Sequence, residues 1–163
     1  MEERIIQTIG IFCRGPLVLL GMKLRGFGVG FWNGPGGKFE PAKDRNVEES
    51  FDREALEEAV LTVKRKEKVG YIEFEFVDKP GKVLETHIFR VLEYEGEPQD
   101  GEEMRWQWFG EAEKEIPYQQ LWPADEYWLP PVLAGKKIRG KVRYDSKEAK
   151  NILFKDLREV EEI

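Results

Sequence analysis

The sequence predicts a mixed α+β fold (mixed α/β) in which a largely antiparallel sheet is accompanied by two helices. Three observations lead to this prediction. Apolar and polar residues alternate in several segments, with the period of half-buried strands. Short turns rich in glycine and proline join many of these segments, as in hairpins. Only two segments have the spacing of helices, so a doubly wound parallel sheet fits poorly. With 163 residues, 40% of them hydrophobic, the chain is predicted to form one domain, 1–163, with its own core.

The first elements are predicted to be a hairpin and a long loop. Residues 5–12 and 17–22 are apolar and flank Arg14-Gly15-Pro16, which predicts two paired strands. Residues 25–37 follow, with glycines at positions 26, 28, 30, 34, 36 and 37 and Gly21 just upstream. Neither a helix nor a strand tolerates that density of glycine, so this stretch is predicted to be a loop.

A helix is predicted to follow the loop, from residue 47 to about residue 64. Its apolar residues recur at a spacing of four, at Val47, Phe51, Ala55 and Ala59. Asp44 or Asn46 is placed to cap its start.

The rest of the chain is predicted to consist mainly of strands, because apolar residues alternate with polar ones. The expected elements are strands at 69–77 and 83–94 joined by a turn at 79–82, a strand at 104–109, a helix at 122–133 beginning near Pro123, and strands at 138–144 and 152–160.

The charge balance limits the classes of partner. The chain has 26 basic and 32 acidic residues, a net charge of −6, which argues against a protein that coats a nucleic acid polymer. The sequence begins with acidic residues and contains no apolar run of the length that spans a bilayer, so neither a signal peptide nor a membrane partner is expected. Cytoplasmic localisation is predicted.

Two residue types occur once each and exclude some chemistries. Cys13 is the only cysteine, so no disulfide forms within the chain; its apolar surroundings predict a buried, inert thiol. His87 is the only histidine, so zinc sites with several histidines are excluded, and any Ser-His-Asp or Cys-His site would depend on it alone.

A cluster of glutamates is the sharpest chemical feature. Glu54, Glu57 and Glu58 have the spacing i, i+3 and i+4, which places them within an arc of about 100° on the predicted helix. They repel one another unless a cation lies between them; Arg53 offsets part of the repulsion and a divalent ion such as Mg²⁺ would offset more. A solvated acidic helix face is the alternative. The glycine-rich loop before the helix favours the metal, because its backbone can approach phosphate or metal closely.

These residues resemble a known motif. Gly36-Gly37-Lys38 followed by Arg53-Glu54-x-x-Glu57-Glu58 is similar to the Nudix box, Gly-x5-Glu-x7-Arg-Glu-U-x-Glu-Glu-x-Gly-U, where U is apolar. The resemblance extends over nearly the whole chain to the branch of this family that hydrolyses oxidised purine nucleoside triphosphates, the MutT homologues of mammalian type. The segments that carry it are Leu20-Gly21-Met22-Lys23, Arg25-Gly26-Phe27-Gly28, Trp32-Asn33-Gly34, Phe74-Glu75-Phe76-Val77, Glu103-Met104-Arg105, Trp122-Pro123 with Tyr127-Trp128, and Leu157-Arg158-Glu159-Val160.

The resemblance implies the Nudix fold, a mixed, largely antiparallel sheet packed between helices with a loop-helix-loop at the box. It also implies cleavage of a nucleoside triphosphate to the monophosphate and pyrophosphate with Mg²⁺, or alternatively Mn²⁺, as cofactor. The implied catalytic residues are Glu58, which orients or deprotonates water, and Glu54, Glu57 and Arg53. The implied metal ligands are Gly37, Glu54, Glu57, Glu58 and Glu103.

The same resemblance implies the substrate-binding residues. Lys23 would contact the triphosphate, and seven residues would surround the purine: Thr8, Phe27, Asn33, Phe74, Leu84, Trp122 and Asp125. The aromatic rings would stack on the base, while Asn33 and Asp125 would form hydrogen bonds with its edge. The expected partner is a small nucleoside triphosphate, and the chain is expected to be a monomer.

The sequence departs from the motif in four places. The motif's first glutamate falls at Arg45, with Glu40, Glu48 and Glu49 as candidate substitutes, and Gly37 fits the first glycine only if the loop is two residues longer. Val60 replaces the glycine after the helix, so the helix end is predicted to be remodelled or to continue toward Thr62. Ala124 replaces the first of two aspartates, which predicts a narrower or shifted base preference.

Three functions are therefore compatible with the sequence. The first is hydrolysis of oxidised purine nucleoside triphosphates, which would sanitise the nucleotide pool. The second is hydrolysis of another nucleotide, methylated or unmodified. The third is a Nudix domain that binds nucleotides without catalysis. The four glutamates of the predicted metal site favour an enzyme over a binding domain.

Overall fold

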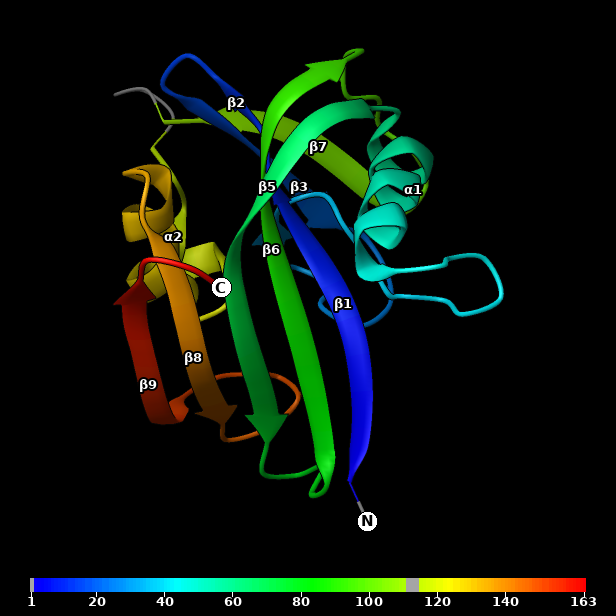
Figure 1. Cartoon of the computed structure of the whole chain (residues 1–163). Helices are drawn as coiled ribbons and strands as arrows, with labels where there is room; N and C mark the ends of the chain where they lie inside the picture. The colour runs from blue at the N-terminus through cyan, green and yellow to red at the C-terminus, as the bar shows by residue number, and fades with distance from the viewer. Residues whose placement is uncertain (1, 111–114) are drawn as a thin grey trace.

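The computed structural model describes residues 2–110 and 115–163 and contains two sheets (Figure 1). The larger sheet has five strands in the order β1-β6-β5-β8-β9, and the smaller one contains β2, β3, β4 and β7. The strands are β1 (Glu3–Ile11), β2 (Cys13–Arg14), β3 (Leu17–Lys23), β4 (Trp32–Asn33), β5 (Thr62–Phe76), β6 (Lys82–Glu95), β7 (Met104–Phe109), β8 (Lys137–Tyr144) and β9 (Ile152–Val160); the helices are α1 (Val47–Ala59), the 3-10 turn η1 (Tyr118–Gln120) and α2 (Asp125–Leu133).

The strand pairing confirms the predicted mixed α+β class. β1 and β6 are parallel, as are β5 and β8, whereas β5 with β6, β8 with β9, and β3 with β7 are antiparallel. The predicted hairpin is confirmed at its turn, where Cys13 and Arg14 pair with β3 around Gly15 and the Phe12 carbonyl accepts the Leu19 N–H. Its first strand is shorter than predicted, because residues 3–11 pair with β6 and the chain then passes to the smaller sheet.

The larger sheet lies between the helices, as the resemblance implied. Phe51 of α1 stacks on Phe89 near one end of the sheet, and Gly10 of β1 leaves room for it, since a Cβ there would lie 2.4 Å from the Phe51 ring. The opposite face of the sheet packs against α2 and the smaller sheet. We call the face beside α1 the outer face and the other the inner face; the larger core fills the inner face, with Ile72, Val142 and Trp128 in it.

Helix α1 ends earlier than predicted, and the residue that follows it explains why. Val60 has φ of 61° and ψ of 37°, and its N–H donates to the carbonyls of Ala55 and Leu56, so it terminates the helix in the left-handed region. The predicted continuation toward Thr62 is therefore wrong, and β5 begins at Thr62 instead. The start agrees better, because the Asn46 side chain accepts the Glu49 N–H at 2.8 Å.

Val60→Gly is expected to stabilise the protein. A non-glycine residue in the left-handed region costs about 1 kcal/mol, and the Val60 side chain is 42% exposed, so little buried surface is lost with it. We expect the free energy of unfolding in urea to rise by about 1 kcal/mol. Leu56→Gly, on the exposed face of the same helix, is the matched control and should lower it; a lower stability of Val60→Gly would contradict the argument.

Smaller differences also follow from the structure. The glycine-rich loop contains the short strand β4, which pairs with β3, and α2 begins at Asp125 and not at residue 122. Cys13 is exposed, so the prediction of a buried thiol is wrong. No helix within the described residues is long and apolar enough to cross a membrane.

Candidate active site

A cavity of about 430 Å³ brings most of the predicted site residues together. All eight predicted substrate-binding residues line it, namely Thr8, Lys23, Phe27, Asn33, Phe74, Leu84, Trp122 and Asp125. Four of the predicted metal ligands line it as well: Gly37, Glu54, Glu58 and Glu103. Arg53 and Glu57 are not among its lining residues, so they act on it only through their neighbours.

The glycine-rich loop reaches the cavity because it runs along the edge of the larger sheet. The N–H groups of Thr8 and Gly10 in β1 donate to the carbonyls of Gly37 and Pro35, at 2.9 and 2.6 Å. Residues 35–39 therefore occupy the side of β1 that faces away from β6. This arrangement holds the backbone of the loop beside the glutamates of α1.

Two of the loop glycines have no room for a side chain. A Cβ on Gly36, whose φ is 155°, would lie 2.0 Å from the Thr8 carbonyl oxygen, and one on Gly37 would lie 2.5 Å from the Glu54 carboxylate. Glycine is thus required for the backbone to approach both β1 and the acidic helix face. The Gly36 N–H donates to Glu58 at 3.5 Å, a long contact.

Two carboxylates at the acidic end of the cavity, Glu54 and Glu58, have raised pKa values. Burial, followed by the charge of Glu54, raises the pKa of Glu58 to about 8, and burial also raises the pKa of Glu54. Lys23 acts in the opposite direction on Glu58, while Glu103 adds to the repulsion. The acidic end of the cavity therefore has an excess of negative charge that a cation would relieve.

Arg53 holds the helix face in place from outside the cavity. Its Nη1 donates to Glu54 and Glu57, each at 3.0 Å, and its Nε and Nη2 donate to the two oxygens of Asp44 at 2.7 and 2.8 Å. Asp44 is buried, and the guanidinium group lowers its pKa to about 2. Its Oδ2 also accepts the Glu40 N–H at 2.9 Å, which closes the loop before the helix.

Asp44 was considered from the sequence only as a helix cap, and its contact with Arg53 was missed. The candidates weighed for the missing carboxylate do not make this contact at hydrogen-bond distance: Glu40 lies 3.6 Å from Arg53, Glu49 pairs with Arg45, and Glu48 is exposed. The position of Asp44 one residue before Arg45, in a loop two residues longer than the motif, was the available signal.

The carboxylates at the acidic end of the cavity are suited to a hard divalent cation, although their oxygens do not converge on one point in this structure. Within residues 2–110 and 115–163, no three acidic, histidine or cysteine side chains are close enough to hold a metal. Glu57 is turned toward Arg53, and Glu103 toward Arg25 at 3.1 Å. The half-buried carboxylates of Glu54 and Glu58 nevertheless have the chemistry that Mg²⁺ prefers, and because burial raises the pKa of both, a cation beside them would stabilise their charged forms.

The Gly37 carbonyl, which the resemblance implies as a metal ligand, already accepts hydrogen bonds within the protein. The Gly37 carbonyl accepts the Thr8 N–H at 2.9 Å and the Thr8 hydroxyl at 3.3 Å. No hydrogen bond to the Gly36 carbonyl is found within the described part of the chain. The Gly36 carbonyl therefore keeps its accepting capacity, whereas that of Gly37 is used by Thr8.

Aromatic rings form the other end of the cavity. Trp122 stacks on Phe31 with centroids 4.5 Å apart and lies 5.4 Å from the ring of Phe27, which is 51% exposed. Phe31, which the sequence analysis did not single out, thus belongs to this wall. Phe74 stacks on Tyr144 at 5.9 Å, so it is held by packing while it lines the cavity. The rings provide flat apolar surfaces suited to a base.

One ionisable group is buried at this aromatic end. Asp125 is buried, which raises its pKa to about 7, and its Oδ1 accepts the Trp128 Nε1–H at 2.7 Å. The neighbouring Ala124 is also buried, and its N–H donates to the Tyr144 hydroxyl at 3.1 Å. Near neutral pH, Asp125 can therefore either donate or accept a hydrogen bond toward a ligand.

Comparisons with known proteins agree with this geometry. Residues 7–132 match the family described as NUDIX domain. The chain is 42% identical to the mouse protein named oxidized purine nucleoside triphosphate hydrolase, over 99% of both chains, and 43% identical to the zebrafish (Danio rerio) protein of that name, over 97% of both. Among solved structures, a mutator MutT protein from Bacillus halodurans superposes with a TM-score of 0.76 at 25% identity, covering 94% of this chain and 97% of that one. The chain is thus a member of the Nudix family.

Proposed function

We propose that this protein hydrolyses oxidised purine nucleoside triphosphates, such as 8-oxo-dGTP, to the monophosphate and pyrophosphate. The observation that carries the proposal is a single cavity with a cluster of carboxylates at one end and aromatic rings with a buried aspartate at the other. A triphosphate and a purine require these two environments in one ligand. The similarity to the mouse and zebrafish hydrolases supports the same substrate class.

We further propose Mg²⁺ as the cofactor, with Mn²⁺ as the alternative. Glu54, Glu58, Glu103 and the Gly36–Gly37 backbone would hold it at the acidic end, with Glu57 nearby. When bound, a divalent cation there would neutralise phosphate charge and favour ionisation of water. Glu58 would orient that water and accept its proton, since it is the most deeply placed of the carboxylates and its pKa is poised near neutral pH.

The remaining residues would bind and orient the nucleotide. Lys23 would contact the triphosphate, Phe27 and Trp122 would stack on the base, and Asn33 and Asp125 would read its edge. Every residue of the cavity comes from one chain, so this chemistry requires no second copy. The single cysteine, which can form no disulfide within the chain, favours a reducing compartment such as the cytoplasm.

Pyrophosphate release from a panel of nucleoside triphosphates tests this function. We expect Mg²⁺-dependent release from an oxidised purine nucleotide, loss of release with EDTA, and the appearance of the nucleoside monophosphate. Faster turnover of a methylated or unmodified nucleotide would favour the second function considered above. Thermal stabilisation by nucleotides without any release would instead indicate a binding domain.

Ala124→Asp is expected to broaden the base preference. An aspartate at this position would lie beside Asp125, and two adjacent carboxylates share protons, which allows the pair to match more than one pattern of base hydrogen bonds. The kcat/KM for 8-oxo-dGTP divided by that for 2-hydroxy-dATP measures the preference. We expect this ratio to come about tenfold closer to one in the variant. Ala124→Asn is the control without the second titrating group. Equal, high rates of the wild-type protein on both bases would contradict the argument.

A further inference from the structure

The strand β9 forms a free edge of the larger sheet. Within residues 2–110 and 115–163 it pairs with β8 alone, and all nine of its residues lie at this edge. The residues after it turn back across the sheet, away from the free side (Figure 1). Leu153 and Phe154 are 57% and 43% exposed on this strand. An exposed edge of this kind is a template for pairing with another strand.

The sequence of β9 is complementary to itself when read in the opposite direction. The complementary part is Phe154-Lys155-Asp156-Leu157-Arg158-Glu159-Val160, and the apolar Leu157 is at the centre of this segment. A two-fold axis through Leu157 places Asp156 opposite Arg158, Lys155 opposite Glu159, and Phe154 opposite Val160. Opposite charges and apolar pairs facing one another across antiparallel strands are stabilising.

The complementarity selects one register. A two-fold axis that relates two antiparallel strands of one sheet is perpendicular to the sheet, so each side chain and its copy lie on the same face. Residues that are directly opposite also share a face, and the axis must therefore pass midway between two copies of the same residue. Centres at Lys155, Asp156, Arg158 or Glu159 each place a charge directly opposite an identical charge. Of the five positions 155–159, only Leu157 avoids this repulsion, and a centre nearer either end of β9 leaves fewer residues opposed.

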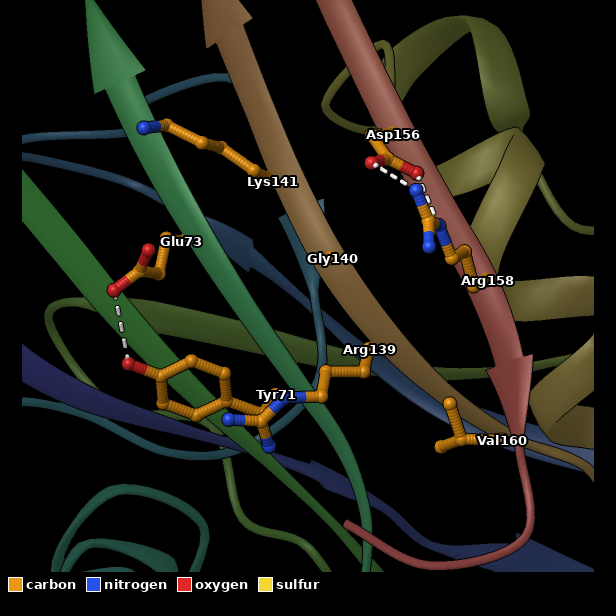
Figure 2. A pocket seen from close by; sticks show the side chains of 8 residues that line it. All are labelled: Tyr71, Glu73, Arg139, Gly140, Lys141, Asp156, Arg158 and Val160. Atoms are coloured by element: carbon orange, nitrogen blue, oxygen red, sulfur yellow. Dashed lines mark hydrogen bonds and ion pairs between the residues drawn. The ribbon is translucent and has the colours of Figure 1, made fainter.

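The complementary side chains divide between the two faces of the sheet: Leu157 packs against the inner core and Lys155 lies over the Tyr127 ring of α2, whereas Asp156 and Arg158 lie on the outer face. Figure 2 shows Asp156 and Arg158 on the outer face of β9, paired with each other at 2.9 and 3.0 Å, with Val160 further along the strand. Their side chains are 44% and 75% exposed, so both retain access to a second partner. In the two-fold arrangement each Asp156 would lie between the Arg158 of its own strand and that of the other copy.

We propose that two copies of this chain associate through antiparallel pairing of their β9 strands, centred on Leu157, to form a continuous ten-stranded sheet. This inference concerns a surface remote from the cavity and does not depend on the proposed function. It departs from the monomer predicted from the sequence, because the register appears only when β9 is known to be an unpaired edge. Association through one strand buries little surface, so it is weak and favoured by high protein concentration and low salt.

Charge reversal tests the pairing. In sedimentation equilibrium over a range of concentrations, we expect Asp156→Arg and Arg158→Asp each to raise the dimer dissociation constant at least about tenfold. An equimolar mixture of these two variants should associate again, because every pair between them is then of opposite charge. Lys79→Asp, in the exposed turn between β5 and β6, is the control and should behave as the wild type. A wild-type chain that stays monomeric to several hundred micromolar, or a mixture that does not recover, would overturn the proposal.

Disulfide trapping tests the register independently of affinity. In a Cys13→Ser background, Leu157→Cys would place the two thiols on directly opposed residues, whose Cα atoms are about 5 Å apart in such a pair. Lys155→Cys would place them about 13 Å apart along the strands. We expect rapid cross-linking of the first variant and not of the second. Equal cross-linking of both, or of neither, would contradict pairing centred on Leu157.

Discussion

Glu58→Gln is expected to lower kcat by at least about a thousandfold with little change in KM. Glutamine preserves the size of the side chain but cannot accept a proton from water or supply a charged ligand. Glu58 lines the cavity and is half-buried beside Glu54, at the acidic end where we propose that water is activated. The measurement is steady-state pyrophosphate release at saturating Mg²⁺.

Glu57→Gln is the matched control for this result. Glu57 is on the same turn of the helix, but its side chain is 53% exposed, bound to Arg53, and absent from the cavity lining. We expect a loss of about tenfold or less, since it acts at the periphery of the site. A larger loss in Glu57→Gln than in Glu58→Gln would exchange the roles that we propose for these two residues.

Asp44→Ala is expected to destabilise the protein by about 3 kcal/mol, because it removes one partner of a buried ion pair. Asp44 binds Arg53 through both of its oxygens and also accepts the Glu40 N–H, so the variant frees the loop and leaves the guanidinium group partly unpaired. Urea denaturation measures the loss. Activity should fall as well. Without Asp44, Arg53 would bind Glu54 and Glu57 more strongly, and these carboxylates would then be less available to a metal ion.

The dependence of stability on acidic pH distinguishes the contribution of the Asp44–Arg53 ion pair from that of packing, which does not depend on pH. The pKa of Asp44 is about 2 in the folded protein, below its ordinary value of 3.8. The unfolded chain therefore binds more protons between these values, and the contribution of Asp44 to stability is lost as the pH falls from about 4 to 2. Asp44→Ala should show a flatter dependence in this range. Glu49→Ala, which removes the exposed pair with Arg45, should cost less than about 1 kcal/mol.

The periodic parts of the fold could be predicted from the sequence. The spacing of Glu54 and Glu58 placed them on one side of a helix, and both line the cavity, because helical geometry depends on local spacing alone. The alternation of strands β6 to β9 was equally informative. The resemblance, and not periodicity, supplied the aromatic end of the site, since Phe27 and Trp122 are far apart in the sequence.

The parts that could not be predicted depend on contacts between distant segments or on an unusual backbone. β1 pairs with β6, more than seventy residues away, and no local pattern distinguishes that partner from β3. Asp44 meets Arg53 through the path of an irregular loop, which residue counting cannot follow. Val60 adopts a conformation that its own side chain disfavours, because β5 must begin immediately after the helix.

The loop at residues 35–39, which lies along β1, has a consequence for assembly. Its hydrogen bonds cover the backbone of Ile6, Thr8 and Gly10, whereas β9 is paired on one side only along its whole length within the described residues. Strand addition at this part of β1 would have to displace the loop, so β9 is the more accessible of the two borders. The same glycines that shape the cavity would thus direct association to β9 and disfavour growth into longer assemblies.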